Sequence, residues 1–372
     1  MTTPPGSPPP SDPIGSRKAD HIRLALDTPT PRAGSAAGPM GDVALVPDAA
    51  PEVDFAELDA SVTLLGHHLE LPLVIASMTG GHPEGERING LLARAAERHG
   101  LAMGLGSQRA ALHDPDLART YAVARTQAPT APLFANVGAA QLVAQGDVPA
   151  VSIEEVGRLV EMIRADALIV HLNALQELIQ PEGDRNARGW LAAIARLAAE
   201  LPVPVIVKEV GGGISAEVAV RLVAAGVAAI DVGGRGGTSF ASIEGRRAAE
   251  RGDARGVAIA TLFETWGIPT PASIVFAARA GVPVIATGGI RSGLDAAGAI
   301  ALGATGVGVA RPLLEAAMAG PDAIDTWIER FREGLLAAQF LTGSTTLGDL
   351  RRVQVVLSGE SARWVAASGA AV

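Results

Sequence analysis

The feature that most constrains this fold is an alternation of short apolar segments and helix-like segments, which begins at residue 73. Eight segments are apolar throughout, as parallel strands covered on both faces are. They span 73–77, 101–106, 133–138, 167–173, 204–210, 228–234, 283–289 and 306–311. Stretches such as RINGLLARAAERHG and AEVAVRLVAAG lie between them, with apolar residues at helical spacing. Eight strand–helix units in one chain predict an α/β fold, a (β/α)8 TIM barrel.

A doubly wound open sheet is the alternative arrangement for alternating strands and helices. It is disfavoured because no dinucleotide-binding fingerprint follows the first apolar segment. The glycine-rich sequences GLGSQR and GGGISA do not have the required spacing. We therefore predict a single barrel domain over residues 17–372.

The N-terminal stretch MTTPPGSPPPSDPIGS is rich in proline and lacks the apolar core of a signal peptide. This composition predicts a disordered tail over residues 1–16 and a cytoplasmic protein. Residues 27–53 show little pattern and are expected to form a loop.

Composition excludes several classes of partner and site. The net charge of −9 argues against nucleic acid, whose phosphates need a basic surface. No uncharged apolar run reaches the length of about 18 residues that a membrane span needs. The absence of cysteine excludes disulfides, thiolate metal sites and cysteine nucleophiles. A small molecule is therefore the expected partner.

Polar side chains gather where the predicted strands end, which in such a barrel is the face that carries the active site. Glycines at these places are explained as turn residues, but the other side chains are not. The set comprises Ser107, Gln108, Arg109, Asn136, His171, Asn173, Gln176, Glu177, Lys208, Thr238, Arg291 and Arg311. We interpret it as a functional site at one mouth of the barrel.

The last two strand ends predict a phosphate site. TGGIRSG and VARPLLEAA follow the seventh and eighth strands, and Pro312 suits a first helical position. Glycine backbone N–H groups and a helix N-terminus favour an anion, and these are the usual phosphate-binding loops of a barrel. The alternative for Arg311 is an ordinary surface charge.

Lys208 is unusual because it lies inside an apolar strand, where a lysine is costly unless it is paired or hydrogen-bonded. Its neighbour Glu209 points to the opposite face and is not expected to be its partner. Three interpretations remain open: a core ion pair, a Schiff-base lysine, or a lysine beside an anionic cofactor ring. FMN fits the third, with its phosphate at the last two loops and its ring near Lys208 and the sequence SMT.

Several sequences together resemble the type 2 isopentenyl-diphosphate isomerases. They are SRKADH, ASMTGG, GLGSQR, HLNALQELIQPEGD, VIVKEVGGGIS, GRGGTSF, TGGIRSG and VARPLLEAA. The resemblance extends from Arg17 to about Gly343; HLNALQE and SRKADH are specific to it, whereas TGGIRSG is shared with many flavin barrels. The chain departs from the family pattern in its proline-rich extension and at Gly233 and Phe240, where serine and tryptophan are common.

The resemblance implies an isomerase of isoprenoid biosynthesis that interconverts isopentenyl and dimethylallyl diphosphates and requires FMN and Mg²⁺. It implies that reduced FMN is the active form, with NADPH as the flavin reductant and no net redox change. It also implies a homo-oligomer, either a tetramer or an octamer.

Individual roles follow from the same resemblance. Gln176 matches the catalytic residue placed against the carbon skeleton, and Glu177 matches the Mg²⁺ ligand. A glutamine amide is a poor acid and a poor base, so flavin N5 is the expected proton carrier and Gln176 orients or relays. Substrate contacts are implied for Arg17, Lys18, Ser107, Arg109, His171, Asn173 and Gln176. Flavin contacts are implied for Ser77, Met78, Thr79, Ser107, Asn136, Lys208, Thr238, Gly289, Ile290, Arg291, Ala310 and Arg311.

Three other functions fit the residues less well. A flavin-dependent 2-hydroxy-acid oxidase needs a histidine base in a late loop, yet all seven histidines lie at or before residue 171. An enzyme like inosine-monophosphate dehydrogenase needs a cysteine nucleophile, which the chain lacks. A non-catalytic phosphate-binding module does not explain Gln176 beside Glu177.

Overall fold

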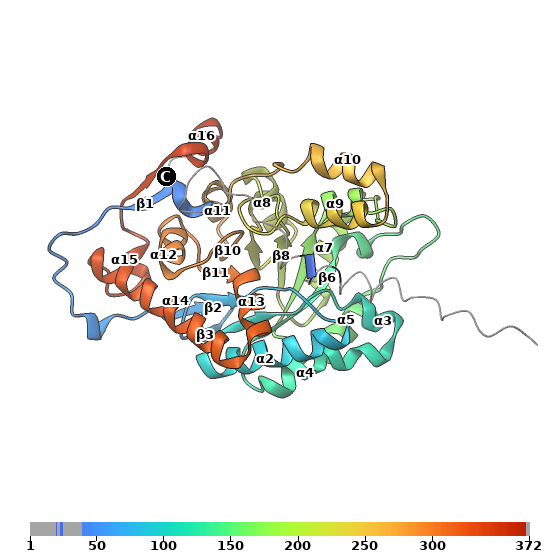
Figure 1. Cartoon of the computed structure of the whole chain (residues 1–372), viewed down its shortest axis with the longest axis horizontal. Coiled ribbons are helices and arrows are strands. Elements are labelled where there is room, and N and C mark those ends of the chain that lie inside the picture. The colour runs from blue at the N-terminus through green and yellow to red at the C-terminus, as the bar shows by residue number, and fades with distance from the viewer. Residues whose placement is uncertain (1–19, 21–22, 25–38, 370–372) are drawn as a thin grey trace, which may run out of the picture.

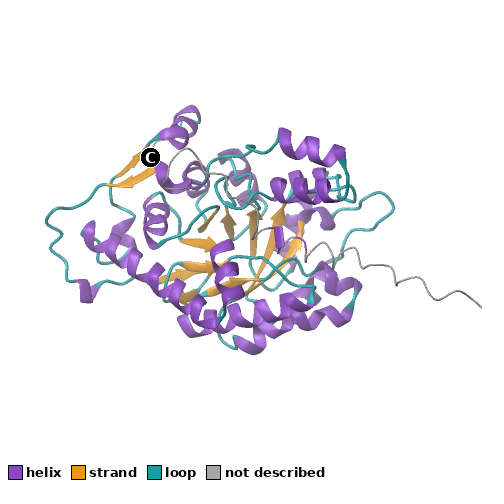
Figure 2. Cartoon of the chain, in the orientation of Figure 1, coloured by secondary structure: helices purple, strands orange, loops and turns teal. Residues whose placement is uncertain are grey.

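The computed structural model describes residues 20, 23–24 and 39–369 and centres on a closed barrel of parallel strands surrounded by helices (Figure 1, Figure 2). The predicted (β/α)8 barrel is confirmed, and each of the eight predicted segments contains one barrel strand of the described chain. The predicted tail over 1–16 lies outside the described residues, as do Arg17 and Lys18.

Neighbouring barrel strands pair in parallel, and the last strand pairs with the first, which closes the sheet. In chain order they are β4 (Leu73–Ile75), β5 (Ala102–Gly104), β6 (Leu133–Gly138), β7 (Ala167–Leu172), β8 (Val205–Glu209), β9 (Ala229–Asp231), β10 (Val284–Thr287) and β11 (Gly306–Val309). Most predicted segments extend past the observed carboxyl ends, because strand pairing stops where the polar and glycine-rich loops begin.

Helices form the outer layer of the molecule (Figure 2). The α-helices are α2 (Pro83–His99), α3 (Arg109–His113), α4 (Arg119–Gln127), α5 (Ile153–Met162), α6 (Ala174–Ile179), α7 (Trp190–Glu200), α8 (Ala216–Ala224), α9 (Phe240–Glu250), α10 (Ala254–Leu262), α11 (Thr270–Ala278), α12 (Gly293–Ala301), α13 (Arg311–Ala319), α14 (Pro321–Leu341), α15 (Leu347–Leu350) and α16 (Gly359–Ala367). Short 3-10 helices are η1 (Pro39–Asp42), η2 (Phe55–Glu57), η3 (Pro115–Ala118) and η4 (Ala139–Leu142). Among the described residues, no helix combines the length and the apolar character that crossing a membrane requires.

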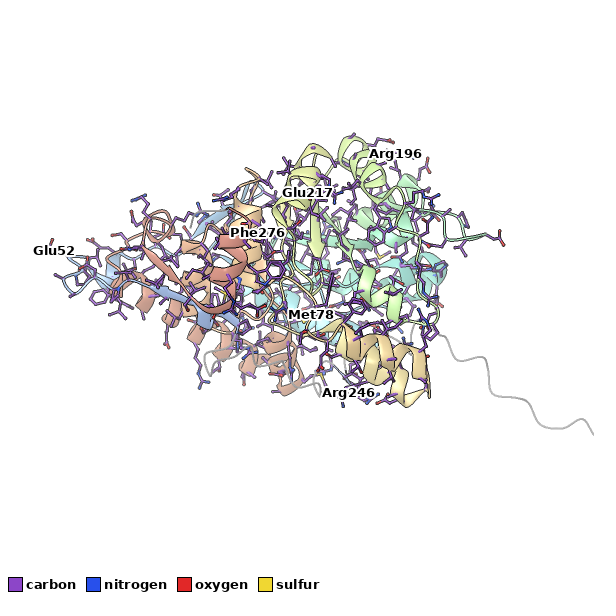
Figure 3. All side chains as sticks on the ribbon, turned by 90° about the horizontal axis from the view of Figure 1, so that it is seen from above. Glu52, Met78, Arg196, Glu217, Arg246 and Phe276 are labelled. Carbon is purple, nitrogen blue, oxygen red and sulfur yellow. The ribbon has the colours of Figure 1, made fainter. Side chains whose placement is uncertain are left out.

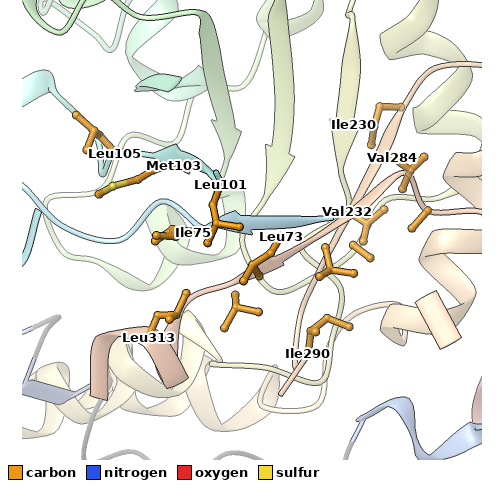
Figure 4. Packing of buried hydrophobic residues seen from close by; sticks show 14 of the residues in the cluster. Leu73, Ile75, Leu101, Met103, Leu105, Ile230, Val232, Val284, Ile290 and Leu313 are labelled. Atoms are coloured by element: carbon orange, nitrogen blue, oxygen red, sulfur yellow. The ribbon is translucent and has the colours of Figure 1, made fainter. Parts of the chain in front are cut away.

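The barrel strands are buried on both faces over most of their length, which is why their sequences are apolar except near the carboxyl ends. The side chains that face the helices join one large cluster, part of which Figure 4 shows around Leu73, Ile75 and Val284. Residues that alternate with them form a smaller cluster inside the barrel: Val74, Ala102, Phe134, Ala167, Ile169, Ile206, Ala229 and Ile285.

Two smaller antiparallel sheets complete the fold. The hairpin of β2 (Val62–Leu64) and β3 (His67–Leu69) adds Leu64 and Leu69 to the inner cluster, so it covers the barrel end opposite the polar loops. Strand β1 (Val43–Leu45) pairs with β12 (Val355–Leu357). The expectation of a loop over 27–53 is therefore wrong for residues 39–45. A local pattern could not reveal this strand, because its partner lies near the other end of the chain.

The inner face of the strands changes from apolar to polar toward the carboxyl ends. On five strands, a polar residue follows a residue of the inner cluster by two positions. These polar residues are Asn136 on β6, His171 on β7, Lys208 on β8, Asp231 on β9 and Thr287 on β10. Side chains two residues apart on a strand share a face, so these polar groups surround one mouth of the barrel. The strand register also places His171 beside Lys208, and Lys208 beside Asp231.

Candidate functional site

A cavity of about 470 Å³ opens where the barrel strands end, and all eight strand-end loops contribute to its lining. Every predicted contact residue in the described part of the chain lines it. These residues are Ser77, Met78, Thr79, Ser107, Arg109, Asn136, His171, Asn173, Gln176, Glu177, Lys208, Thr238, Gly289, Ile290, Arg291, Ala310 and Arg311. Figure 3 shows Met78 near the middle of the molecule, away from Glu52 at one end and Arg196 at the upper edge.

Gln108 has a structural role instead, although the sequence groups it with the polar set. Its side chain is fully buried and does not line the cavity. Its amide nitrogen donates to the Leu159 carbonyl at 3.0 Å, and its amide oxygen accepts from the Asn136 backbone N–H at 2.9 Å. Gln108 therefore holds β6 against the helix layer.

His171 is held in one orientation by Asn136. Its Nδ1 lies 2.8 Å from the Asn136 amide oxygen. An amide oxygen only accepts hydrogen bonds, so Nδ1 carries a proton. Gly138 on the neighbouring strand is needed for this packing, because a Cβ there would lie 2.8 Å from His171 Nε2. Protonation at Nε2 would then make the ring a cationic donor for an anionic ligand.

Glu177 is a buried carboxylate, 6% exposed, at the start of α6. One of its oxygens accepts from the Asn173 amide at 2.8 Å, and the other accepts from the Asp184 backbone N–H at 2.9 Å. Each oxygen keeps a further lone pair, because a carboxylate offers about four acceptor positions. Within the described chain, no group of three or more His, Asp or Glu side chains could hold a metal ion. A cation at Glu177 would therefore need water or a bound ligand to complete its shell.

Gln176 is positioned by Glu244, a buried carboxylate on α9. The amides of Gln176 and Gln180 both donate to Glu244 Oε1, at 3.1 and 2.5 Å. Because the nitrogen of Gln176 is engaged there, its amide oxygen is the acceptor it can present to a ligand. We did not predict Glu244, since a single carboxylate on a helix carries no sequence signal that distinguishes it from a solvated one.

Arg247 joins Glu244 to the N-terminal segment. Its buried guanidinium lies 3.3 Å from Glu244, 3.1 Å from Glu182 and 3.6 Å from Asp20. Arg23 adds a hydrogen bond of 2.7 Å to Glu250 on the same helix, and Leu24 is fully buried. The chain therefore passes close to Gln176 only a few residues after Arg17 and Lys18.

Arg109 is held by Asp184, in the loop that follows α6. Its guanidinium lies 3.1 Å from Asp184 Oδ2, and the Gln141 amide donates to the same oxygen at 2.9 Å. Through its backbone N–H the same aspartate also binds Glu177. Asp184 thus binds both the Arg109 guanidinium and the Glu177 carboxylate. The sequence QPEGD places it near the site, but nothing in that pattern pairs it with Arg109.

Lys208 forms a buried ion pair with Asp231, with its Nζ 3.6 Å from Asp231 Oδ2. Nζ also donates to the Glu209 backbone carbonyl at 2.8 Å. The Glu209 carboxylate points elsewhere, as predicted, and accepts from the backbone N–H groups of residues 211–213. We did not predict Asp231, although it follows an inner core residue by two positions just as Lys208 does. Of the interpretations of Lys208, the core ion pair is therefore observed, and the same lysine also lines the cavity.

The residues present fit a bound flavin. Ser77 Oγ and Thr79 Oγ1 are buried hydroxyl oxygens without a protein partner, and both residues line the cavity. Buried hydroxyls without partners are costly, so a polar ligand is the natural complement. The same wall carries Lys208 and Asn136, which can bind carbonyl and ring-nitrogen atoms.

The glycine-rich loops after β9 and β10 pack backbone against backbone. A Cβ on Gly237 would lie 2.8 Å from the Gly289 nitrogen, and Gly289 has a φ of +91°, which favours glycine. Gly289, Ile290 and Arg291 then lead into α12, whose N-cap is Ser292. Opposite them Arg311 and Pro312 begin α13. Backbone N–H groups and two helix N-termini therefore meet at one end of the cavity, which suits a phosphate.

Comparison with known proteins identifies relatives over nearly the whole chain. The family model of the FMN-dependent dehydrogenases matches residues 40–357. An isopentenyl-diphosphate delta-isomerase from Methanoregula boonei is 49% identical over 93% of this chain and 94% of its own. Proteins of the same name from Halobacterium salinarum and Archaeoglobus fulgidus are 47% and 46% identical, each over 94% of this chain and over 95% and 97% of their own.

Solved structures show the same fold at low sequence identity. A lactate oxidase from Pediococcus acidilactici superposes with a TM-score of 0.65 at 17% identity, covering 93% of this chain and 94% of the oxidase. A mandelate oxidase variant superposes with a TM-score of 0.59 at 21% identity, over 92% of this chain and 99% of its own. At these identities the likeness concerns the barrel architecture alone.

Proposed function

The chain belongs to the isopentenyl-diphosphate delta-isomerases and to the wider family of FMN-dependent dehydrogenases, and on this premise we propose that it interconverts isopentenyl and dimethylallyl diphosphates with reduced FMN and Mg²⁺. The observation that carries the proposal is one cavity that combines a phosphate cradle, a buried lysine, and Gln176 next to Glu177. The Glu177 carboxylate can bind a metal ion and the Gln176 amide can contact a hydrocarbon chain. Together they suit a diphosphate ester as substrate better than a 2-hydroxy acid.

The flavin would bind along the wall from the glycine loops to Lys208. Its phosphate would lie at Gly289, Ile290, Arg291, Ala310 and Arg311, and its ring would contact Ser77, Met78, Thr79, Asn136, Lys208 and Thr238. The unpartnered oxygens of Ser77 and Thr79 support this placement. Both groups of residues line the same cavity, so one ligand as long as FMN could contact them together.

The diphosphate would bind on the side of the cavity formed by β7 and α6. Arg109, protonated His171 and Asn173 supply donors for its oxygens, and Ser107 adds a hydroxyl. Arg17 and Lys18 would add charge from the N-terminal segment, since Asp20 is docked on Arg247 close to Gln176. One protein carboxylate together with substrate phosphates is a common way to hold Mg²⁺, and Glu177 would be that carboxylate.

Moving the double bond requires a proton at one carbon and the loss of a proton from another. Reduced FMN, when bound, would supply a proton carrier at N5, so that the proton given to one carbon is balanced by the proton taken from the other. Gln176 would orient the hydrocarbon and relay a proton through its amide oxygen, while Glu244 holds the amide nitrogen at 3.1 Å. The apolar barrel core below and the substrate above would exclude bulk water from this contact.

A 2-hydroxy-acid oxidase is the function that the fold comparison most readily suggests. In such an enzyme a histidine base from a late loop takes the proton of the substrate. Among the described residues His171 is the histidine that lines the cavity, and it lies on β7 with Nδ1 tied to Asn136. An isomerase is therefore favoured over an oxidase.

Two assays on the purified protein test the proposal. We expect a yellow protein that releases FMN on denaturation and, once reduced anaerobically with Mg²⁺ present, converts isopentenyl diphosphate into dimethylallyl diphosphate. Oxygen consumption with lactate or mandelate and no isomerisation would support the oxidase instead. The proposal has three further parts. NADPH as the reductant is tested by titration of the flavin with NADPH, and assembly into a homotetramer or homo-octamer is tested by the molecular mass in solution. A cytoplasmic location is tested by cell fractionation.

Replacing Glu177 with glutamine is expected to raise the Mg²⁺ concentration needed for half-maximal turnover at least tenfold, or to abolish turnover. The amide keeps the size of the side chain but loses the charge that binds the cation, at a cost on the order of 1.5–3 kcal/mol. Turnover measured against free Mg²⁺ checks this. Full activity of Glu177→Gln in chelator would show that the carboxylate serves only to begin α6.

Replacing Asp184 with asparagine separates the positioning of Arg109 from the binding of Mg²⁺. The variant loses the ion pair to Arg109 but keeps the backbone N–H that binds Glu177. We expect kcat/KM to fall about tenfold, a loss of about 1.4 kcal/mol, with the Mg²⁺ requirement unchanged. A shift of that requirement as large as in Glu177→Gln would contradict this division of roles.

A further inference from the structure

The ion pair of Lys208 and Asp231 is part of a network that crosses three neighbouring strands. Lys208 lies on β8, Asp231 on β9 and Thr287 on β10, and the strand register sets Lys208 directly beside Asp231. The ammonium and the carboxylate are 3.6 Å apart, with side-chain exposures of 11% and 6%. Lys208 and Thr287 line the cavity, whereas Asp231, on the strand between them, does not.

Asp231 is held in place beside the lysine by hydrogen bonds to its carboxylate. Its Oδ1 accepts one hydrogen bond from the Thr287 hydroxyl and another from the Gly233 backbone N–H at 3.3 Å. The Gly233 N–H also donates to Thr287 at 3.0 Å. The two contacts to Oδ1 hold the carboxylate directly, and the contact between Gly233 and Thr287 fixes its two donors relative to each other. The ammonium of Lys208 is anchored from the other side by the Glu209 carbonyl.

We propose that Asp231 is a positioning residue that fixes the Lys208 ammonium and balances its charge next to the flavin site. This inference rests on the proposed function, because it assumes FMN beside Lys208. In oxidised FMN the ring is neutral, and the Asp231–Lys208 pair is neutral in sum. When the flavin is reduced the ring gains negative charge, and the paired carboxylate limits how strongly the ammonium can attract it. Asp231 would thus keep the reduced flavin from being stabilised too far.

The charge balance predicts the direction of an effect on the flavin itself. Asp231→Asn keeps the shape of the side chain and removes its charge, so the ammonium is no longer compensated. The variant is expected to favour reduced over oxidised FMN about tenfold or more relative to wild type, because a close charge commonly changes such an equilibrium by one to three decades. Tenfold corresponds to a midpoint potential about 30 mV more positive for a two-electron couple.

The experiment is a reductive titration of the purified holoprotein against a reference dye, without substrate. Wild type, Asp231→Asn, Lys208→Met and the double variant form a cycle. Burial raises the pKa of Asp231 and the Lys208 charge opposes that shift. Without the lysine the rise in the pKa of Asp231 is no longer opposed by that charge, so the carboxyl carries less charge and Asp231→Asn is expected to change the potential less in the Lys208→Met background than in wild type.

Thr287→Val is the matched variant if Asp231→Asn folds poorly. It removes the hydrogen bond that stabilises the charged carboxylate, so the potential should move in the same direction by a smaller amount. An unchanged potential in both variants, or an equal shift with and without Lys208, would overturn the inference. A protein that binds no FMN and does not isomerise would reject the proposed function instead, so the two failures are distinguishable.

Discussion

Turnover of isopentenyl diphosphate is expected to fall roughly 10²–10⁴-fold when Gln176 is replaced with alanine, the range for a positioned proton-transfer group. Gln176 lines the cavity next to Glu177, and its amide nitrogen is already engaged by Glu244 at 3.1 Å. Its amide oxygen is thus oriented before the substrate binds. The variant should keep its FMN content and its fold, so the loss belongs to the chemistry. Single-turnover kinetics of the reduced protein measures it directly.

Gln180→Ala is the control for this substitution. Gln180 donates to the same oxygen of Glu244 at 2.5 Å, and it also lines the cavity, but it is 2% exposed and is the C-cap residue of α6, one turn after Gln176. We expect a loss much smaller than that of Gln176→Ala, because Gln176 keeps its own contact with Glu244. Wild-type turnover in Gln176→Ala would make this glutamine a bystander and leave both proton transfers to other groups.

FMN affinity is expected to fall about 10²-fold or more in Arg311→Glu. A hydrogen bond to a charged group contributes about 1.5–3 kcal/mol, and the new carboxylate adds repulsion of the phosphate. Arg311 begins α13 at the phosphate end of the cavity, and its Nε binds Glu315 at 2.8 Å. Fluorescence titration of the apoprotein with FMN gives the dissociation constant.

Arg196→Glu is the control for Arg311→Glu, because it makes the same charge reversal away from the cavity. Like Arg311 with Glu315, Arg196 pairs with a glutamate four residues later in the same helix, Glu200 on α7. Figure 3 shows Arg196 at the edge of the molecule. Its FMN affinity should equal that of wild type. Equal affinity in Arg311→Glu as well would mean that the phosphate does not lie between α12 and α13.

The fold was predictable because the chain repeats one simple pattern. A strand buried on both faces must be apolar, and the eight barrel strands are apolar except for polar residues toward their carboxyl ends. The site was predictable where a polar residue interrupts such a strand, as Lys208 does, or follows it, as Asn173 does. β1 escaped prediction because its partner β12 is remote in sequence.

The partners of the site residues were harder to predict than the residues themselves. Glu244 reaches Gln176 across the gap between α9 and α6, and Asp184 reaches Arg109 from the loop after α6. Contacts between separate loops depend on how the helices pack around the barrel, which no local pattern encodes. Asp231 is the exception, because a period of two from Ala229 would have placed it on the inner face beside Lys208.

The most direct test of the account counts product against reductant. The protein is reduced anaerobically with a small, known amount of NADPH, and excess isopentenyl diphosphate is added with Mg²⁺. We expect many molecules of dimethylallyl diphosphate for each NADPH oxidised, because the rearrangement moves protons and no net electrons. Reductant oxidised in step with each product molecule would contradict the account and make the protein a reductase or an oxidase.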